Sequence, residues 1–187
     1  MTRAGSAVLL SGALALSGCY RGGAHSVSPA DVKAQDGWQL VDGVPLIRQP
    51  NPHECGPAAL AMVLRRWGVA AHVAQVARET GTSGQSVAAG ALRDEARRRG
   101  LQAFLIRGEW DDLVHEVGSD RPVLVGLIQR YTNDRAYAHY EVVVGINARS
   151  QQLLLLDPGN GMREDAMSSF SKEWEGAGRL TLVVGPR

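Results

Sequence analysis

The 187-residue chain has the composition of an ordinary globular protein, with 44% hydrophobic and 21% charged residues. Its formal net charge of +1 argues against a nucleic acid partner, because nucleic acid-binding proteins carry a pronounced excess or patch of positive charge. The length is typical of a single domain, and the sequence contains no internal repeat.

The N-terminus resembles a bacterial lipoprotein signal peptide. Arg3 supplies a positive charge, and the apolar run Ala7–Leu16 that follows is too short to span a bilayer. This run ends in "LSGC", where small residues stand directly before Cys19. The resemblance implies a signal peptide over residues 1–19, a lipid on Cys19 and a periplasm-facing location in the cell envelope. Tyr20, in place of an aspartate, favours the outer membrane; a plain secretory signal and a membrane helix are the alternatives.

The next segment, residues 20–39, has no apolar periodicity and is rich in Gly, Ser and Ala. Such a composition is typical of a flexible tether between the membrane and a folded domain. We therefore expect the domain to occupy residues 40–187.

In the first half of this domain, hydrophobic periodicity predicts mainly helices. Leu60, Val63, Leu64 and Trp67 are spaced as one face of a helix, and Gly68 ends that helix. The predicted helices cover 55–67, 73–80, 87–99 and 110–117, and the predicted strands cover 44–47 and 101–106.

The second half predicts strands, because short apolar runs are bounded by turn residues. These runs cover 122–128, 139–146, 153–157 and 180–184, with a last helical turn over 168–174. Helices followed by strands indicate an α+β protein in which an N-terminal helical lobe packs on an antiparallel sheet.

Cys55 lies where the first of these helices is predicted to begin. In "ECGPAAL", Pro57 suits a first helical turn, where its missing N–H is not needed. The free N–H groups and the positive end of the helix dipole favour an ionised thiolate at this position. If Cys19 carries a lipid, Cys55 has no partner for a disulfide, because the chain holds two cysteines. Cys55 is therefore a candidate nucleophile.

A cysteine nucleophile needs an acid–base partner, and His139 is the best candidate among the five histidines. It opens one apolar run, and Asp157 ends the next. In adjacent antiparallel strands the start of one lies beside the end of the other, so we expect these two residues to be neighbours. Asp157 would then orient the imidazole, as in catalytic triads. Alternatively, Asp157 only stabilises the turn in "DPGNG", as aspartates commonly do.

His53 and Cys55 stand close together in the sequence and could be two ligands of a metal. No further cluster of Cys and His residues completes such a site, so we expect neither a metal nor another cofactor.

Several of these segments resemble the bacteriocin-processing cysteine peptidases. This is family thirty-nine of the papain-like clan, best known as the leader-peptidase domain of bacteriocin ABC exporters. The resemblance covers about Val44 to Val184, and the order glutamine, cysteine, histidine, aspartate is that of the family. The segments that carry it are Gln49, "ECGPAAL", "RPVLVGL", "HY" with "VVVG", "DP" and "FSKEWEGAGRL".

The resemblance implies a papain-like fold and a peptide or protein substrate. By position, Cys55 would be the nucleophile, His139 the general base and acid, and Asp157 the residue that orients His139. Gln49 would donate its side-chain amide to the oxyanion, together with the backbone N–H of Cys55. Known members cut after a Gly-Gly pair at the end of a leader peptide.

The chain also departs from the exporters. It contains no phosphate loop of the pattern G-x-x-x-x-G-K-[ST], because neither Lys33 nor Lys172 follows a glycine. We therefore expect no ATP-binding site in this chain. Exporter peptidase domains meet their leaders on the cytosolic side, whereas a lipoprotein lies outside the cytoplasmic membrane, so Gly-Gly specificity stays open.

Two other functions fit the same residues. One is a catalytically idle module that binds an extended peptide, and the other is a thiol amidase or transpeptidase. If Asp157 plays no part, Asp134 or Asn160 could orient His139, or the site is a Cys–His dyad.

Overall fold

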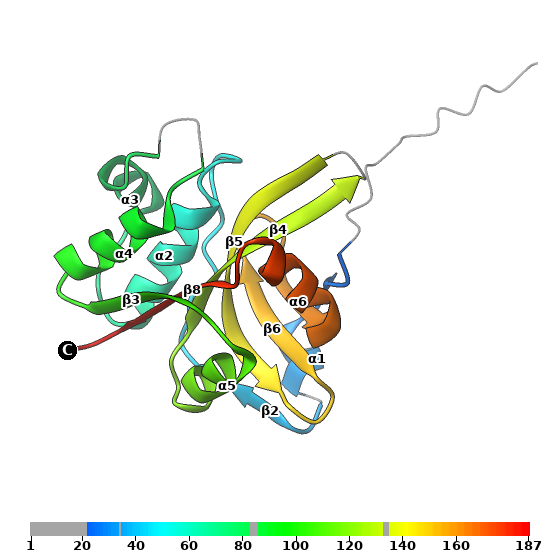
Figure 1. Ribbon diagram of the computed structural model, residues 1–187. Coiled ribbons are helices and arrows are strands. Elements are labelled where there is room, and N and C mark those ends of the chain that lie inside the picture. Colours follow the sequence, from blue (N-terminus) through cyan, green and yellow to red (C-terminus); the bar gives the residue numbers. More distant parts are fainter. Residues whose placement is uncertain (1–21, 34, 83–85, 133–134) are drawn as a thin grey trace, which may run out of the picture.

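The computed structural model describes residues 22–33, 35–82, 86–132 and 135–187. The expected signal peptide and Cys19 lie outside these residues. The described chain forms an antiparallel sheet of eight strands with helices on both of its faces (Figure 1). Seven strands follow the order β1-β7-β6-β5-β4-β8-β3, and β2 pairs with β5. The expected α+β architecture is confirmed.

The helical lobe covers one face of the sheet. It comprises α2 (Cys55–Arg66), α3 (Val73–Glu79) and α4 (Ala89–Arg98), on the left in Figure 1. Helix α2 is buried along nearly its whole length, from Cys55 to Leu64, because it lies between the other two helices and the sheet. Leu60 and Leu92 of this lobe share one apolar core with Val142 of β5.

The opposite face of the sheet carries α5 (Trp110–Gly118) and α6 (Met167–Gly176). Leu113 of α5 and Phe170 of α6 pack in a second core with Val125, Val143 and other side chains of the central strands. A sheet buried on both faces needs apolar side chains at successive positions. This double burial explains the continuous apolar runs in the second half of the sequence.

The predicted central strands are confirmed, with longer bounds in the hairpin that carries His139. The strands are β3 (Gln102–Arg107), β4 (Val123–Thr132), β5 (Arg135–Asn147), β6 (Gln152–Asp157) and β8 (Leu180–Gly185). The hairpin of β4 and β5 extends beyond the rest of the sheet (Figure 1), because β6 pairs only with the C-terminal half of β5, from Val142 onward.

One expected strand is absent, and one observed strand was not predicted. The segment 44–47 forms no strand, which is consistent with Pro45 lacking a backbone donor; its Val44 and Ile47 still pack against the core. Strand β7 (Gly161–Ala166) was missed, because its sequence GMREDA shows no apolar alternation. Its charged residues are nevertheless buried, and one of them reaches the candidate site.

The part of the expected tether that the structure describes is folded. Strand β1 (His25–Ser26) pairs with β7, and β2 (Trp38–Leu40) pairs with β5. Between them, the short helix α1 (Pro29–Lys33) places Val32 in the core with 2% of its surface exposed. These residues are therefore held on the sheet rather than extended away from it.

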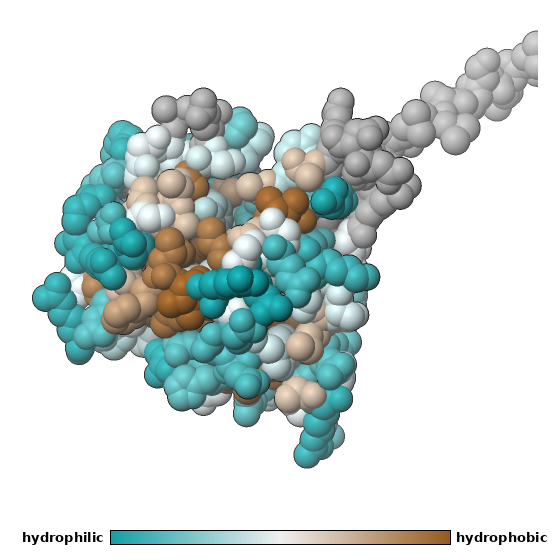
Figure 2. Space-filling view, viewed as in Figure 1, coloured by the Kyte–Doolittle hydropathy of each residue, from teal (hydrophilic) through white to brown (hydrophobic). Residues whose placement is uncertain are grey.

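One apolar surface is visible in Figure 2, where brown atoms gather over β3 and β8. Strand β3 contributes Phe104 and Ile106, which are 53% and 38% exposed.

In the described residues no helix is both long and apolar enough to cross a membrane.

Candidate active site

Cys55 is the first residue of α2, as the sequence predicted. It is a free cysteine with 3% of its surface exposed. The N–H of Ala58 makes a bond of the helical type to the carbonyl of Glu54, and Pro57 has no N–H. The N–H groups of Cys55 and Gly56 therefore have no acceptor within the helix. Together with the helix dipole, they favour negative charge on the sulfur or on a bound oxyanion.

Gly56 allows the start of α2 to approach its neighbours closely. A Cβ atom at this position would lie 2.3 Å from Val87 Cγ1 and 3.1 Å from Tyr140 Cδ2. The Tyr140 hydroxyl donates to the Val87 carbonyl at 3.1 Å, which connects β5 to the entry of α4. This close packing brings Cys55 against the strand that carries His139.

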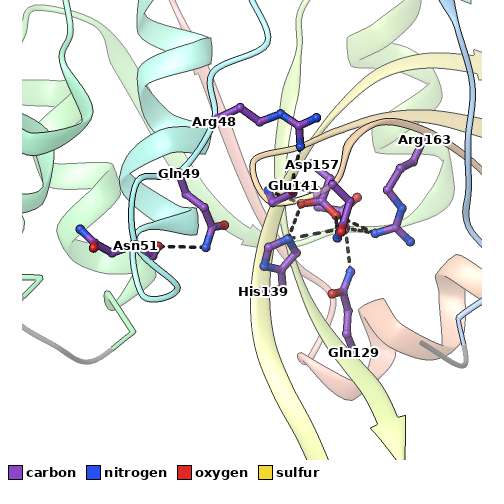
Figure 3. A network of polar contacts seen from close by, with 10 residues as sticks. Arg48, Gln49, Asn51, Gln129, His139, Glu141, Asp157 and Arg163 are labelled. Carbon is purple, nitrogen blue, oxygen red and sulfur yellow. Dashed lines mark hydrogen bonds and ion pairs between the residues drawn. The ribbon is translucent and has the colours of Figure 1, made fainter. Parts of the chain in front are cut away.

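His139 lies between Cys55 and Asp157. Its Nε2 is 2.8 Å from Asp157 Oδ1, and its ring makes a further hydrogen bond with Cys55. Because Nε2 faces the carboxylate, Nδ1 is the ring nitrogen left for the thiol. Figure 3 shows His139 with its ring directed toward Asp157, at the end of β6. The structure therefore brings His139 and Asp157 together as expected, but His139 lies within β5 and not at the start of the strand.

These contacts favour a charged imidazole. Burial alone would lower the pKa of His139, but the hydrogen bonds to Asp157 and Cys55 and the charges of Glu141 and Asp157 raise it to about 10. Burial likewise disfavours ionised Asp157, yet its contacts with His139, Asn160 and Arg163 hold its pKa well below the usual range. The pair is therefore an imidazolium and a carboxylate at neutral pH.

The turn after β6 fixes the Asp157 carboxylate. The backbone N–H of Gly159 donates to Oδ1 at 2.7 Å, and Asn160 Nδ2 donates to Oδ2 at 2.7 Å. Asn160 is thus a partner of Asp157 and not its replacement, and Asp134 lies outside the described residues. Asp157 is fully buried and serves both the turn and His139, so the two roles considered from the sequence coexist.

Gln49 lies beside this turn. Its backbone N–H donates to the Pro158 carbonyl at 3.0 Å, and its Nε2 donates to the Asn51 carbonyl at 2.9 Å (Figure 3). The amide nitrogen carries two hydrogens, so one remains for another acceptor. The side-chain oxygen of Gln49 is buried without a hydrogen-bond partner among the described residues.

His53 lies exposed in the loop before α2.

Three polar residues behind His139 were not singled out from the sequence. They are Gln129 of β4, Glu141 of β5 and Arg163 of β7, and all three are buried. A signal existed: Glu141 is an acid inside the apolar run "HYEVVVGI", where a charge needs a partner.

His139, Glu141 and Asp157 also offer ligand atoms within 4.8 Å of one another, as a small metal site would. However, Arg163 Nη1 already binds both carboxylates, at 3.0 Å from Glu141 Oε1 and 2.8 Å from Asp157 Oδ2. A guanidinium thus supplies the positive charge that a metal would bring, and we assign no metal there.

A comparison with known families decides the classification. The profile described as "Peptidase C39 family" matches residues 43–184. The chain belongs to the peptidase C39 family. As a C39 protein it is a cysteine-type peptidase, so the expected class of enzyme is confirmed.

Curated relatives include the Lactococcin-G-processing and transport ATP-binding protein LagD of Lactococcus lactis subsp. lactis. It is 24% identical over 131 residues, which are 70% of this chain and 18% of LagD. The C39 chain thus spans less than a fifth of that relative's length. An uncharacterized protein of Methanothermobacter marburgensis is 33% identical over 131 residues, which cover 70% of this chain and 83% of that protein.

Solved structures of peptidase domains show the same fold. The peptidase domain of Streptococcus ComA, a bifunctional ABC transporter, matches with a TM-score of 0.64 at 24% identity, covering 78% of this chain and 100% of that domain. A double glycine motif protease from an AMS/PCAT transporter, solved in complex with the leader peptide, matches with a TM-score of 0.62 at 24% identity. That match covers 79% of this chain and 94% of the protease. The expected papain-like fold is confirmed.

Proposed function

We propose that this C39 protein hydrolyses peptide bonds with Cys55 as nucleophile, His139 as acid and base, and Asp157 as the residue that orients His139. The observation that carries the proposal is the position of His139, bonded to Cys55 on one side and to Asp157 on the other. In thiol proteases the nucleophile is hydrogen-bonded to the base, and the base is hydrogen-bonded to the acid that orients it.

Each group has a role in the reaction. His139 holds the proton of the Cys55 thiol as an imidazolium, and the Cys55 thiolate attacks the scissile carbonyl to form a tetrahedral oxyanion. The N–H groups at the start of α2 and the free amide hydrogen of Gln49 would stabilise this oxyanion. When the C–N bond breaks, the imidazolium gives its proton to the leaving amine. Water, deprotonated by His139, then attacks the thioester, and cleavage of the C–S bond restores the Cys55 thiolate beside the His139 imidazolium.

For the substrate, we propose an extended peptide with small residues at the cleavage point, in the first instance Gly-Gly. The support comes from the family and from the similarity to a double glycine motif protease that was solved with a leader peptide. This proposal is tested by comparing the cleavage rates of matched peptides. The peptides differ only at the centre, which is Gly-Gly, Gly-Ala, Ala-Ala or Leu-Leu.

The products identify the reaction class. Peptidase action gives two fragments with a new carboxylate, and the Cys55→Ala variant gives none. A product coupled to an added amine would instead indicate a transpeptidase. Binding of the peptides without turnover, equal in wild type and Cys55→Ala, would overturn the proposal in favour of an idle binding module.

We also propose that the protein is anchored in the bacterial envelope by a lipid on Cys19. The support is the sequence "LSGC" after a short apolar run. Acyl labelling and membrane fractionation of the full chain test this: wild type should be labelled and membrane-bound, and Cys19→Ala should be neither. An unlabelled wild type would contradict the anchor, and separation of inner and outer membranes would show which of them holds it.

A further inference from the structure

A second carboxylate lies behind the candidate catalytic pair. Glu141 is fully buried on β5, two residues after His139 and therefore on the same face of the strand. Its Oε1 is 3.9 Å from His139 Nε2 and accepts a hydrogen bond from Gln129 Nε2 at 2.7 Å. Figure 3 shows Glu141 close to the His139–Asp157 contact.

Arg163 joins this carboxylate to Asp157. It is 4% exposed, and its Nη1 donates to Asp157 Oδ2 at 2.8 Å and to Glu141 Oε1 at 3.0 Å. Asp157 thus has donors on both oxygens, with His139 and Gly159 on Oδ1 and Asn160 and Arg163 on Oδ2. Arg163, itself held by Glu141, is therefore one of the donors that orient Asp157, together with the turn after β6.

Stability alone does not explain these buried charges. Taking an ion pair out of water costs several kcal/mol per ion before the attraction is counted, and apolar replacements are often as stable. The charge balance suggests a different role. A thiolate, an imidazolium, the Asp157 carboxylate and the Arg163 guanidinium sum to zero, so Glu141 is the group that decides whether the cluster is neutral or negative.

We propose that Glu141 and Arg163 are positioning residues of the active site: Arg163 holds the Asp157 carboxylate toward His139, and ionised Glu141 stabilises the imidazolium. This inference rests on the proposed roles of His139 and Asp157. The charged groups that act on Glu141 come from four elements: His139 of β5, Asp157 of β6, Arg163 of β7 and Glu173 of α6.

The proposal has a pH dependence with a definite sign. Burial, and next the charge of Asp157, raise the pKa of Glu141 to about 7, against the opposing effects of Arg163 and His139. Glu141 is therefore neutral in acid and negative above neutral pH. Because a nearby negative charge favours the protonated imidazole, ionised Glu141 keeps His139 charged to a higher pH.

The test is a titration of the His139 ring by NMR in the full-length protein, with the signal assigned by its loss in His139→Ala. Glu141→Gln keeps the shape of the side chain and removes its charge. We expect the His139 transition to move to lower pH by about one unit in this variant. Glu141→Asp, which keeps a carboxylate, should move it by less than half as much. Glu95→Gln, which removes a buried carboxylate in the helical lobe, should not move it.

Two results separate the inference from the proposed function. An unchanged His139 transition in Glu141→Gln would overturn the positioning role, whatever the activity of the protein. A wild-type His139 that titrates near the ordinary value of about 6.5 would instead contradict the charged His139–Asp157 pair itself. If Glu141→Gln does not fold, the wild-type titration decides: the His139 signal should shift as Glu141 ionises near its pKa of about 7, and a signal without any change around that pH would overturn the inference.

Discussion

Two clusters in this protein each combine a pair of carboxylates with arginine, and they differ in solvent access and in what they surround. In the helical lobe, Glu79 and Glu95 bind Arg99, and Arg98 joins them from the surface with 55% of its side chain exposed. In the sheet, Glu141 and Asp157 share Arg163, and all three are at least 96% buried.

The difference shows how the same residue types serve two purposes. In the helical lobe, Arg99 connects α4 to α3, because it binds Glu79 as well as Glu95 and none of the candidate catalytic residues. The buried cluster instead has one guanidinium for two acids, and its remaining cation is a histidine that gains and loses a proton. We therefore expect substitutions in the helical lobe to affect stability and substitutions in the sheet cluster to affect catalysis.

The largest expected contrast is between Asp157→Asn and Glu79→Gln. Loss of the orienting carboxylate should lower kcat by roughly 1,000-fold or more, because the amide cannot stabilise the imidazolium. Glu79→Gln, in the helical lobe, should leave kcat within about twofold. Peptide cleavage by both variants at one pH measures this, with circular dichroism as a control for folding. Equal losses in the two variants would break the distinction between the clusters.

A second contrast is between glutamine substitutions at the candidate site and in the helical lobe. Gln49→Ala should lower kcat by roughly 100-fold, the usual cost of losing one oxyanion donor. Gln75→Ala removes a hydrogen bond to Glu79 in the helical lobe and should not change kcat. Steady-state kinetics separates kcat from KM in each variant. An unaltered kcat in Gln49→Ala would remove Gln49 from the oxyanion site.

Two glycine substitutions test how closely the helical lobe packs against the sheet. Gly56→Ala would place a methyl group against Val87 and Tyr140, so it should displace Cys55 and slow its alkylation several-fold. Gly90→Ala, at the start of α4, meets only Arg93 at 4.0 Å and should be neutral or stabilising by about 0.5–1 kcal/mol. Alkylation rates and urea unfolding measure the two effects, and a harmless Gly56→Ala would contradict the close approach.

A further prediction concerns the pH dependence of stability. The pKa of Glu141 is raised from 4.5 to about 7, so between these values the folded protein binds a proton that the unfolded chain has released. Stability should therefore fall as pH rises through this window, by up to about 3 kcal/mol from this group. Urea unfolding of Glu141→Gln should show a flatter pH dependence than wild type. A parallel curve would mean that Glu141 does not titrate in the window.

Much of this architecture could be predicted from apolar patterns. The helical lobe follows from the spacing of Leu60, Val63 and Leu64, and the central strands follow from apolar runs. The pairing of β5 with β6 brings His139 close to Asp157. This contact was predicted because the two residues lie on consecutive antiparallel strands.

What could not be predicted are the segments stabilised by polar contacts. Strand β7 lacks an apolar pattern because Arg163 and its neighbours are buried through ion pairs, which only the tertiary structure supplies. The segment before residue 40 has the composition of a tether, but one buried residue, Val32, and short pairings with β5 and β7 hold it on the sheet.

The central claim is that Cys55 and His139 act as one unit, and the pH dependence of Cys55 alkylation by iodoacetamide tests it most directly. The full chain with Cys19→Ser leaves Cys55 as the only thiol, and each profile is normalised to its plateau so that access to the thiol cancels. We predict that the wild-type rate persists down to pH 6 and that His139→Ala loses this acidic part of the profile. Identical profiles with and without His139 would contradict the account.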